Sequence, residues 1–343
     1  MGAEREQFGH RTLAKRAQSC NKGRAPVAVV IPSWNTLEYI GPCVASVRDE
    51  TELDVELLVI DNGSVDESVE FLRQEGIAHI GLSENVGFAG AINLAAHNTQ
   101  APLLLVLNAD VILETGCLRT LVDAIVQDSA LAGVQPKIVA PRTGDSTARI
   151  YSAGQALTVA ATAYEIGAGE PDGPAYSQAH EIFGVCGAVC LLRRELFTDL
   201  GGYDERYFAF YEDVDLNARA RLAGWRFAYV PDAVASHVGH ASWGKHETAS
   251  AFNVRLTMQN RISTAVKVFP ASCLPWVLLA TVRSLIASPF RGVGRPAMAG
   301  TLSFMVKLPG LLRERRHLRG ADGSGLDPWL VARRIDRVGQ PRG

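Results

Sequence analysis

Two polar side chains, Asn108 and Asp110, directly follow a strongly apolar stretch of the chain. The preceding residues 102–107 (PLLLVL) predict a strand that is buried on both faces. A carboxylate at the end of a buried strand is costly unless a cation pairs with it. A hard divalent metal suits this position, because Mg²⁺ is typically bound by one or two carboxylates together with substrate phosphates. The pair therefore indicates a metal site that faces a phosphate-bearing ligand.

A second group of acids lies in residues 210–225 (FYEDVDLNARARLAGW). Glu212, Asp213 and Asp215 have the spacing of a first helical turn, where the helix dipole favours acids. One of them could serve as a general base, because an alcohol is a poor nucleophile without one. A solvated helix start is the alternative interpretation. Further on, His237 and His240 follow a predicted strand, where a histidine is more often structural than metal-binding.

The elements that must position these residues follow an alternating pattern. Short apolar strands alternate with helices of roughly ten to fifteen residues, which predicts βαβ units, a mostly parallel sheet and hence an α/β fold. In such sheets ligands bind at the carboxyl ends of the strands. Four polar segments therefore share one rim: residues 32–35, 61–64, 83–87 and 108–110. No GxGxxG follows the first strand and no GxxxxGK[ST] occurs, which argues against ordinary dinucleotide and P-loop sites.

Five motifs, in this order and spacing, resemble glycosyltransferase family 2, and in particular its bacterial rhamnosyltransferase-like members. They are VVIPSWN (29–35), VIDNGSVD (59–66), ENVGFAGAIN (84–93), LNAD (107–110) and the long block at 187–225. The likeness covers roughly residues 27–245. It implies a GT-A fold and inverting transfer of a sugar from a nucleotide diphosphate donor; the helical spacing of apolar residues beyond this range predicts a C-terminal helical extension.

The resemblance assigns donor-binding positions residue by residue. It implies that Pro32 and Asn35 lie beneath the nucleotide and that Asp61 holds a pyrimidine base. Asn62 and Gly63 shape the turn beside that base. The block that lines the ribose and the diphosphate matches Asn85, Gly87, Phe88 and Asn93.

The same resemblance implies the metal, base and acceptor positions. Asn108 and Asp110 occupy the family's DxD position, with Asn in place of the first Asp, so Asp110 carries Mg²⁺ or Mn²⁺ while Asn108 hydrogen-bonds the donor. His237 matches a metal-binding histidine, and His240 is its rival. Asp213 is the expected general base, and Glu212 and Trp243 are expected to bind the acceptor.

The rest of the chain divides by composition. Residues 1–26 read as a disordered lead-in, 27–113 as the nucleotide-binding half, 114–245 as the acceptor-binding half and 246–343 as a basic helical extension. Residues 141–181, rich in Gly, Ala, Ser and Pro, read as a variable excursion before a predicted strand at 182–192. The chain from Ala251 onward holds 15 Lys and Arg against 4 Asp and Glu, whereas the preceding part holds 19 and 32.

The basic extension favours contact with an anionic membrane surface, and helices packed on the catalytic domain are the alternative. No nucleic-acid-binding module accompanies the charge, so nucleic acid is not expected as a partner. Scattered cysteines and the lack of an apolar leader favour a cytoplasmic enzyme, peripheral on the inner face of the cell membrane.

Substrates follow from the resemblance. We expect transfer of L-rhamnose from dTDP-L-rhamnose to a glycan or lipid-linked saccharide, with a UDP-sugar as the alternative donor. A sugar-1-phosphate nucleotidyltransferase and a non-catalytic nucleotide-sugar-binding module are alternatives of other classes. The first would carry a glycine-rich basic loop after the first strand, which residues 29–41 lack, and the second would not need Asp213.

Overall fold

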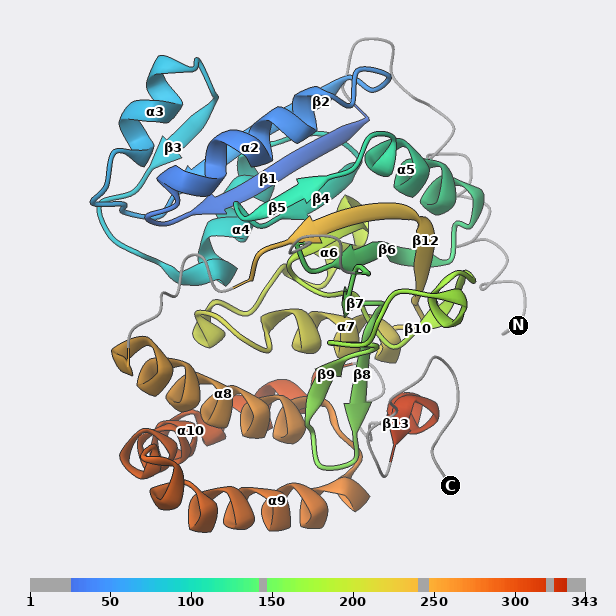
Figure 1. Ribbon diagram of the computed structural model, residues 1–343. Helices are drawn as coiled ribbons and strands as arrows, with labels where there is room; N and C mark the ends of the chain where they lie inside the picture. The colour runs from blue at the N-terminus through green and yellow to red at the C-terminus, as the bar shows by residue number, and fades with distance from the viewer. Residues whose placement is uncertain (1–25, 142–146, 240–246, 319–323, 332–343) are drawn as a thin grey trace.

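The computed structural model describes residues 26–141, 147–239, 247–318 and 324–331. Its centre is a ten-stranded sheet with the order β10-β12-β6-β11-β4-β1-β2-β3, to which β5 and β7 add at β12 and β6 (Figure 1). The strands are β1 Val27–Ser33, β2 Val55–Asp61, β3 His79–Gly81, β4 Leu103–Leu107, β5 Val111–Leu113, β6 Leu131–Val139, β7 Ile150–Ser152, β10 His180–Ile182, β11 Val189–Arg193 and β12 Arg226–His237.

The first half of the sheet is parallel, as the alternating pattern predicts. β1 pairs in parallel with both β2 and β4, and β2 pairs in parallel with β3. In the β1–β2 register Ser33 lies opposite Asp61, so both strands end at the same level. The polar segments that follow these strands therefore share one rim of the sheet, and this prediction is confirmed.

Helices cover both faces of the sheet. Along β1, Val29 and Ile31 pack into a cluster with α2 and α5, while Ala28 and Val30 pack into a cluster with α4 and α6 on the opposite face. This alternation follows from the two-residue period of a strand. One face carries α2 Leu37–Arg48, α3 Ser68–Gln74 and α5 Cys117–Gln127; the other carries α4 Gly87–Asn98, α6 Arg194–Asp199 and α7 Glu212–Leu222. The α/β fold with flanking helices is confirmed.

The single strand expected at 182–192 is wrong. The segment divides into β10, which pairs antiparallel with β12, and β11, which runs antiparallel between β4 and β6. The residues between them, including Gly187, leave the sheet and line a cavity. An apolar run cannot distinguish one long strand from two shorter ones, because the pairing partners decide where the strand breaks.

A second, three-stranded sheet has the order β13-β8-β9 and stands against the main domain. Its strands are β8 Gln155–Thr158, β9 Ala163–Glu165 and β13 Leu330–Val331. β8 and β9 form a hairpin inside the segment expected to be a variable excursion. Short 3-10 turns link other elements: η1 Pro174–Tyr176, η2 Glu205–Tyr207, η3 Ala271–Cys273, η4 Pro289–Arg291 and η5 Ser324–Trp329.

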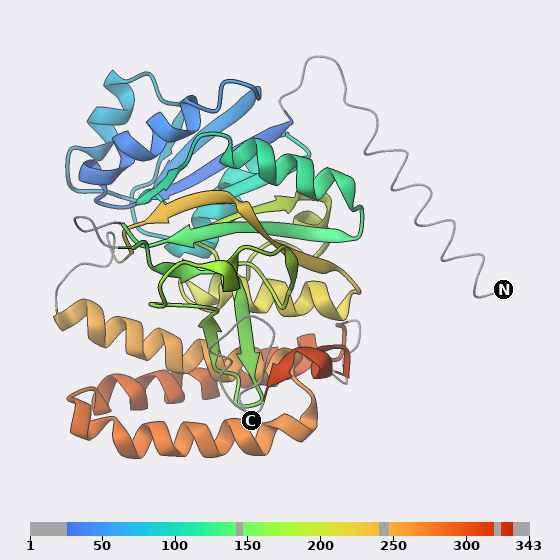
Figure 2. The same cartoon turned by 45° about the vertical axis from the view of Figure 1, so that its right-hand side comes forward.

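Three further helices, α8 Glu247–Val268, α9 Leu274–Ala287 and α10 Gly294–Arg315, form a bundle below the sheet domain (Figure 2). α8 packs on α7 and α10, and α9 lies on the side away from the sheet. None of the helices within the described ranges is both long and apolar enough to cross a membrane.

A network of buried ion pairs joins this bundle to the sheet domain. Lys267 of α8 lies 3.0 Å from Asp215 of α7 and 2.9 Å from Asp204, while Arg219 lies 2.7 Å from Asp215. The side chains of Lys267 and Asp215 are 5% and 0% exposed. Charges this deeply buried are tolerated only in pairs, so each depends on its partner.

Replacing Lys267 with methionine keeps the side-chain length but leaves Asp215 and Asp204 one cation short. We expect the free energy of unfolding to fall by about 3 kcal/mol. Urea unfolding followed by circular dichroism measures this change. Arg291→Met, at an exposed position, is the matched control and should change stability by less than ~0.5 kcal/mol. Equal stability of Lys267→Met and the wild type would mean that the network does not hold the bundle in place.

Candidate active site

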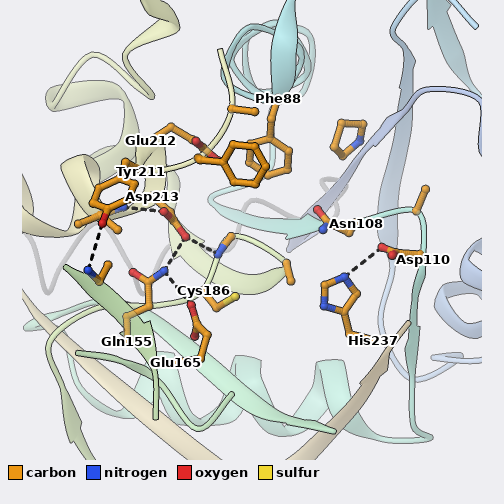
Figure 3. Close-up of a pocket in the computed structure, with 18 of the residues that line it drawn as sticks. Phe88, Asn108, Asp110, Gln155, Glu165, Cys186, Tyr211, Glu212, Asp213 and His237 are labelled. Carbon is orange, nitrogen blue, oxygen red and sulfur yellow. Dashed lines mark hydrogen bonds and ion pairs between the residues drawn. The ribbon is translucent and has the colours of Figure 1, made fainter. Parts of the chain in front are cut away.

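A cavity of about 420 Å³ opens at the carboxyl ends of β1, β2 and β4 (Figure 3). Residues from all four expected rim segments line it, namely Pro32, Asn62, Asn85, Asn108 and Asp110. The long block at 187–225 contributes Glu212 and Asp213, and β12 contributes His237. Residues more than two hundred positions apart thus face one cavity, and those of the four rim segments meet there because parallel strands end at a common edge.

Asn62 braces the side of the cavity that is formed by the turns after β2 and before α4. Its Nδ2 donates to the carbonyl oxygen of Gly87 at 3.1 Å, and its Oδ1 accepts from the Val86 N–H at 2.9 Å. These two bonds tie the end of β2 to the start of α4. Phe88, one residue further along, lines the same cavity. The turn after β2 and the turn that leads into α4 are therefore held as one unit.

Five of the predicted donor-binding residues, Asn35, Asp61, Gly63, Gly87 and Asn93, are not among the side chains that line this cavity. Asn35 accepts from the Val65 N–H, and the Asn93 amide holds the backbone of Tyr203. Asp61 is buried and accepts from the Ser64 N–H at 3.0 Å. Its Oδ2 has no hydrogen-bond partner among the described residues. A buried carboxylate oxygen without a partner is unusual, because buried polar atoms are normally hydrogen-bonded.

Gly87 begins α4 at φ +83°, in the left-handed region. A Cβ at this position would come within 2.4 Å of the carbonyl oxygen of Phe208. That carbonyl also accepts from the Ala89 N–H. Because Gly87 has no side chain, the start of α4 packs directly on the loop that leads to Glu212 and Asp213.

Asp110 and His237 come together although they are 127 residues apart. β5 pairs antiparallel with the end of β12, with Val111 opposite His237, so the two side chains emerge side by side. Asp110 Oδ1 lies 3.1 Å from His237 Nε2, and the ring of Tyr151 packs edge-on against the histidine with its centroid at 4.4 Å. The side chains of Asp110 and His237 are each less than a tenth exposed.

This end of the cavity offers oxygen and nitrogen donors that fit Mg²⁺ or Mn²⁺. Two buried atoms here, Asn108 Oδ1 and His237 Nδ1, lack hydrogen-bond partners among the described residues. No group of three or more His, Cys, Asp or Glu residues able to hold a metal occurs within the described ranges. An ion bound by Asp110 and His237 would therefore take its remaining ligands from a donor phosphate and water.

Asp213 lies across the cavity from Asp110 and His237, in the first turn of α7 (Figure 3). Its Oδ2 accepts from the Gly187 N–H at 2.9 Å and from Gln155 Nε2 at 2.7 Å, and its Oδ1 accepts from the Val214 N–H. A Cβ on Gly187 would approach Asp213 Oδ2 to 3.3 Å, so glycine permits this close contact. A carboxylate has about four acceptor sites, and three are used here.

The loop before α7 is strained. Phe208, Phe210 and Tyr211 have φ values of 63°, 67° and 71°, which bulky residues rarely adopt. Each such residue costs on the order of 1–3 kcal/mol and persists only where its surroundings enforce it. Asn260 of α8 supplies this restraint, because its Nδ2 lies 2.8–2.9 Å from the carbonyl oxygens of Tyr207, Ala209 and Phe210.

Sequence reasoning missed Gln155 and Glu165, which lie on the β8–β9 hairpin and line the cavity. Gln155 Nε2 bridges the two carboxyl groups, donating to Asp213 and to Glu165 Oε1 at 3.2 Å, while its Oε1 accepts from Asn217 at 2.9 Å. Tyr211 fastens the hairpin through bonds to Ala161 and Ala163. No local pattern marks these residues, since isolated polar residues in a Gly- and Ala-rich segment are typical of loops.

Burial changes the acidity of this cluster. It raises the pKa of Glu165 to about 7, and the charge of Asp213 adds to the effect. Burial likewise raises the pKa of Asp213, opposed by its bonds from Gly187, Val214 and Gln155. The pKa of Glu212 is raised well above its usual range by burial and by the neighbouring Asp213. Burial therefore favours the protonated form of both carboxyl groups, and the hydrogen bonds that Asp213 accepts oppose this effect at Asp213.

The predicted alternative metal ligand His240 and the predicted acceptor residue Trp243 lie outside the described residues. Thr257 of α8 lines the cavity, so the helical extension contributes to the site as well as packing on the domain.

Comparison with known proteins decides the family. The sequence model of Glycosyl transferase family 2 matches residues 28–201, just over half of the chain. The chain belongs to this family. The match spans β1 to the end of α6, and therefore includes the turn after β2, the Asn108–Asp110 step and the β8–β9 hairpin. The nucleotidyltransferase alternative is thereby set aside, and the protein is a nucleotide-sugar glycosyltransferase.

One curated relative is the N-acetylglucosaminyl-diphospho-decaprenol L-rhamnosyltransferase of Mycobacterium tuberculosis. It is 28% identical over 240 residues, which cover 62% of this chain and 76% of the relative.

Two solved structures share the fold. The mannosyltransferase PcManGT from Pyrobaculum calidifontis, in complex with GDP-Man and Mn²⁺, aligns over 94% of each chain with a TM-score of 0.51 at 16% identity. GalNAc-T7 with UDP, GalNAc and Mn²⁺ aligns with a TM-score of 0.57 at 16% identity, over 73% of this chain but 49% of that one. This chain therefore has a GT-A-like fold.

The raised pKa of Glu165 predicts how stability depends on pH. An acid with a pKa near 4.5 in the unfolded chain and about 7 in the native state binds its proton more tightly when folded. Stability from this group is present at low pH and is lost as pH rises from about 4.5 to 7. The loss should reach about 3 kcal/mol. Glu165→Gln, which mimics the neutral acid, should therefore gain stability relative to the wild type between pH 5 and pH 8.

Urea unfolding of both proteins at the two pH values measures this difference. Glu195→Gln, at an exposed acid of α6, is the matched control and should follow the wild type at both pH values. A wild type and a Glu165→Gln variant with the same pH dependence would show that Glu165 titrates in its ordinary range.

Proposed function

We propose that this family 2 glycosyltransferase transfers L-rhamnose from dTDP-L-rhamnose, with inversion, to a hydroxyl group of a lipid-linked saccharide at the cytoplasmic face of the cell membrane. One observation carries the proposal. A hydrogen-bonded carboxylate, Asp213, faces the Asp110–His237 pair across a single cavity (Figure 3). Inverting displacement needs one base on one side of the anomeric carbon and stabilisation of the leaving diphosphate on the other.

The leaving-group side is the role of Asn108, Asp110 and His237. A divalent ion bound there would act as a Lewis acid that stabilises the charge developing on the diphosphate. Asp110 and His237 would hold the ion, and Asn108 would orient the donor through its amide. Asp61 would accept a hydrogen bond from the N3–H of the base at its unpartnered Oδ2.

The acceptor side is the role of Asp213 and Glu212. Asp213 retains one acceptor site, which would take the proton of the attacking hydroxyl as the new glycosidic bond forms. A pKa raised toward the working pH makes this carboxylate a better base than an ordinary aspartate. Burial and the neighbouring Asp213 raise the pKa of Glu212 well above its usual range, and in its protonated form Glu212 would donate a hydrogen bond to the acceptor sugar.

The sugar and the acceptor rest on similarity. The relative from M. tuberculosis is named for L-rhamnosyl transfer and for an N-acetylglucosaminyl-diphospho-decaprenol. Thymine and uracil both carry the N3–H group from which Asp61 would accept a hydrogen bond. A UDP-sugar is therefore the second candidate donor. A lipid-linked acceptor requires the enzyme to work at a membrane surface. The remaining alternative, a non-catalytic binding module, is distinguished by turnover.

The first test is a thermal-shift panel of dTDP-L-rhamnose, UDP-sugars and their nucleoside diphosphates, with and without Mn²⁺. A ligand at a hundredfold excess over its Kd should stabilise the protein by about 2.7 kcal/mol. We expect this only with Mn²⁺ and most strongly with dTDP-L-rhamnose. Asp110→Ala should abolish the Mn²⁺-dependent part, whereas Asp199→Ala, at an exposed acid of α6, should retain it.

A stronger response to a UDP-sugar would replace dTDP-L-rhamnose as donor and keep the site. Retention of the Mn²⁺-dependent shift by Asp110→Ala would remove Asp110 from the metal site.

Asp213→Asn tests the base. The amide preserves the shape of the side chain but cannot accept the proton, so kcat should fall about 10²–10⁴-fold while the donor Kd stays unchanged. Release of nucleoside diphosphate in the presence of acceptor measures turnover, and the thermal shift measures donor binding. Asp199→Asn should behave as the wild type. Near-normal turnover by Asp213→Asn would assign the base elsewhere.

A further inference from the structure

α9 and α10 bury one face each against α8 and expose the other. α9 contacts α8 through Val277 and Thr281, the latter hydrogen-bonded to Arg261 of α8, and α10 packs on α8 through Gly300 and Phe304. The opposite faces of both helices point away from α8. In Figures 1 and 2, α9 lies at the end of the molecule farthest from β1–β3.

These outward faces are apolar. On α9 and the turn that follows it, the exposed apolar side chains include Trp276, Leu278, Val282, Ile286 and Phe290, with Leu278 and Ile286 each 65% and Phe290 89% exposed. On α10 they are Met298, Leu302, Met305, Val306 and Leu312, with Val306 84% exposed. We call these ten residues the outer apolar face. Apolar side chains repeated at helical spacing on two adjacent helices are unusual on a surface that meets only water.

The charges beside this face are of one sign. Residues 271–318 contain seven Lys and Arg and a single acid, Glu314. Glu314 is committed to Arg206 at 2.6 Å. Arg283, Arg291, Arg295, Arg313 and Arg316 are exposed. Arginines that flank an apolar helix face match an anionic bilayer, in which the apolar side chains enter the acyl boundary and the guanidinium groups meet lipid phosphates.

A second copy of the chain fits this surface less well. In a two-fold contact the same patch meets itself, so the arginines of one copy would face those of the other. Interfaces between proteins are also depleted of charge at their core. Neither helix is able to span a bilayer, which leaves a helix pair lying flat on it.

We infer that the outer apolar face of α9 and α10, with its flanking arginines, docks the enzyme on an anionic phospholipid surface. The bundle that would rest on the lipid also forms part of the active site, because α8 supplies Thr257 to the cavity wall and Asn260 to the loop before Asp213. An acceptor anchored in the bilayer would thus reach the cavity past this helix bundle. The inference gives the proposed lipid-linked acceptor a physical route but does not depend on the donor sugar.

Sedimentation with vesicles tests this inference on the full chain without any nucleotide. We expect binding to vesicles of phosphatidylcholine with phosphatidylglycerol. Binding to vesicles of phosphatidylcholine alone, or to the mixed vesicles in high salt, should be weaker by a factor of about ten or more. The double variant Ile286→Glu with Phe290→Glu, and the double variant Arg291→Glu with Arg295→Glu, should each weaken binding about tenfold or more. Val126→Glu is the matched control, since Val126 is 64% exposed on α5, remote from the bundle.

Unfolding midpoints and Mn²⁺-dependent donor binding, which need no lipid, should be the same in all variants. Wild-type protein that ignores anionic vesicles would overturn the inference. So would variants that bind as well as the wild type, or variants that convert a dimer into a monomer in gel filtration, because a second copy would then occupy the face. A protein that binds vesicles but no nucleotide sugar would keep the docking surface and refute the proposed function instead.

Discussion

A buried carboxylate must be hydrogen-bonded, and the site depends on how this chain meets that requirement at Asp213. The backbone of Gly187, the backbone of Val214 and the amide of Gln155 each donate to it. These donors come from three different parts of the chain, so the Asp213 carboxylate is held only when the residues before β11, α7 and the β8–β9 hairpin are all in place. Desolvation and hydrogen bonding act in opposite directions on its pKa, with burial the larger effect.

The same requirement explains the unusual backbone beside it. The left-handed residues before α7 bring Glu212 and Asp213 into the cavity at the start of the helix, and their strain must be offset elsewhere. Asn260 offsets it from α8, and Tyr211 then uses its hydroxyl to fasten the hairpin that carries Gln155 and Glu165. The loop before α7, the β8–β9 hairpin and the helical extension are therefore held together by hydrogen bonds. The buried Lys267–Asp215 pair joins α8 to α7 a second time.

The opposite side of the cavity depends on sheet pairing instead. Asp110 ends a buried strand, and the short β5 that follows pairs with the end of β12 so that His237 arrives beside it. The two sides are linked where Gly87 lets α4 approach Phe208. The start of α4 and the loop before α7 thus meet through a backbone contact that no larger residue would permit.

Much of the parallel half could be predicted from the sequence. Apolar runs such as residues 102–107 and the turn residues after them are local signals, and they predicted the strands of the parallel half, the shared rim and the position of Asn108 and Asp110 on it. The long block at 187–225 identified the acids at the start of α7 in the same way.

The tertiary structure alone decided the rest. The division of residues 182–192, the pairing that brings His237 to Asp110, and the roles of Gln155, Glu165 and Asn260 all arise from partners far away in the chain. A hydrogen bond to a buried carboxylate or a strained carbonyl leaves no periodic trace in the sequence, because it requires one polar atom in the right place rather than a repeating pattern. Hydrophobic periodicity therefore determined the framework, and only the folded chain determined which polar atoms meet within it.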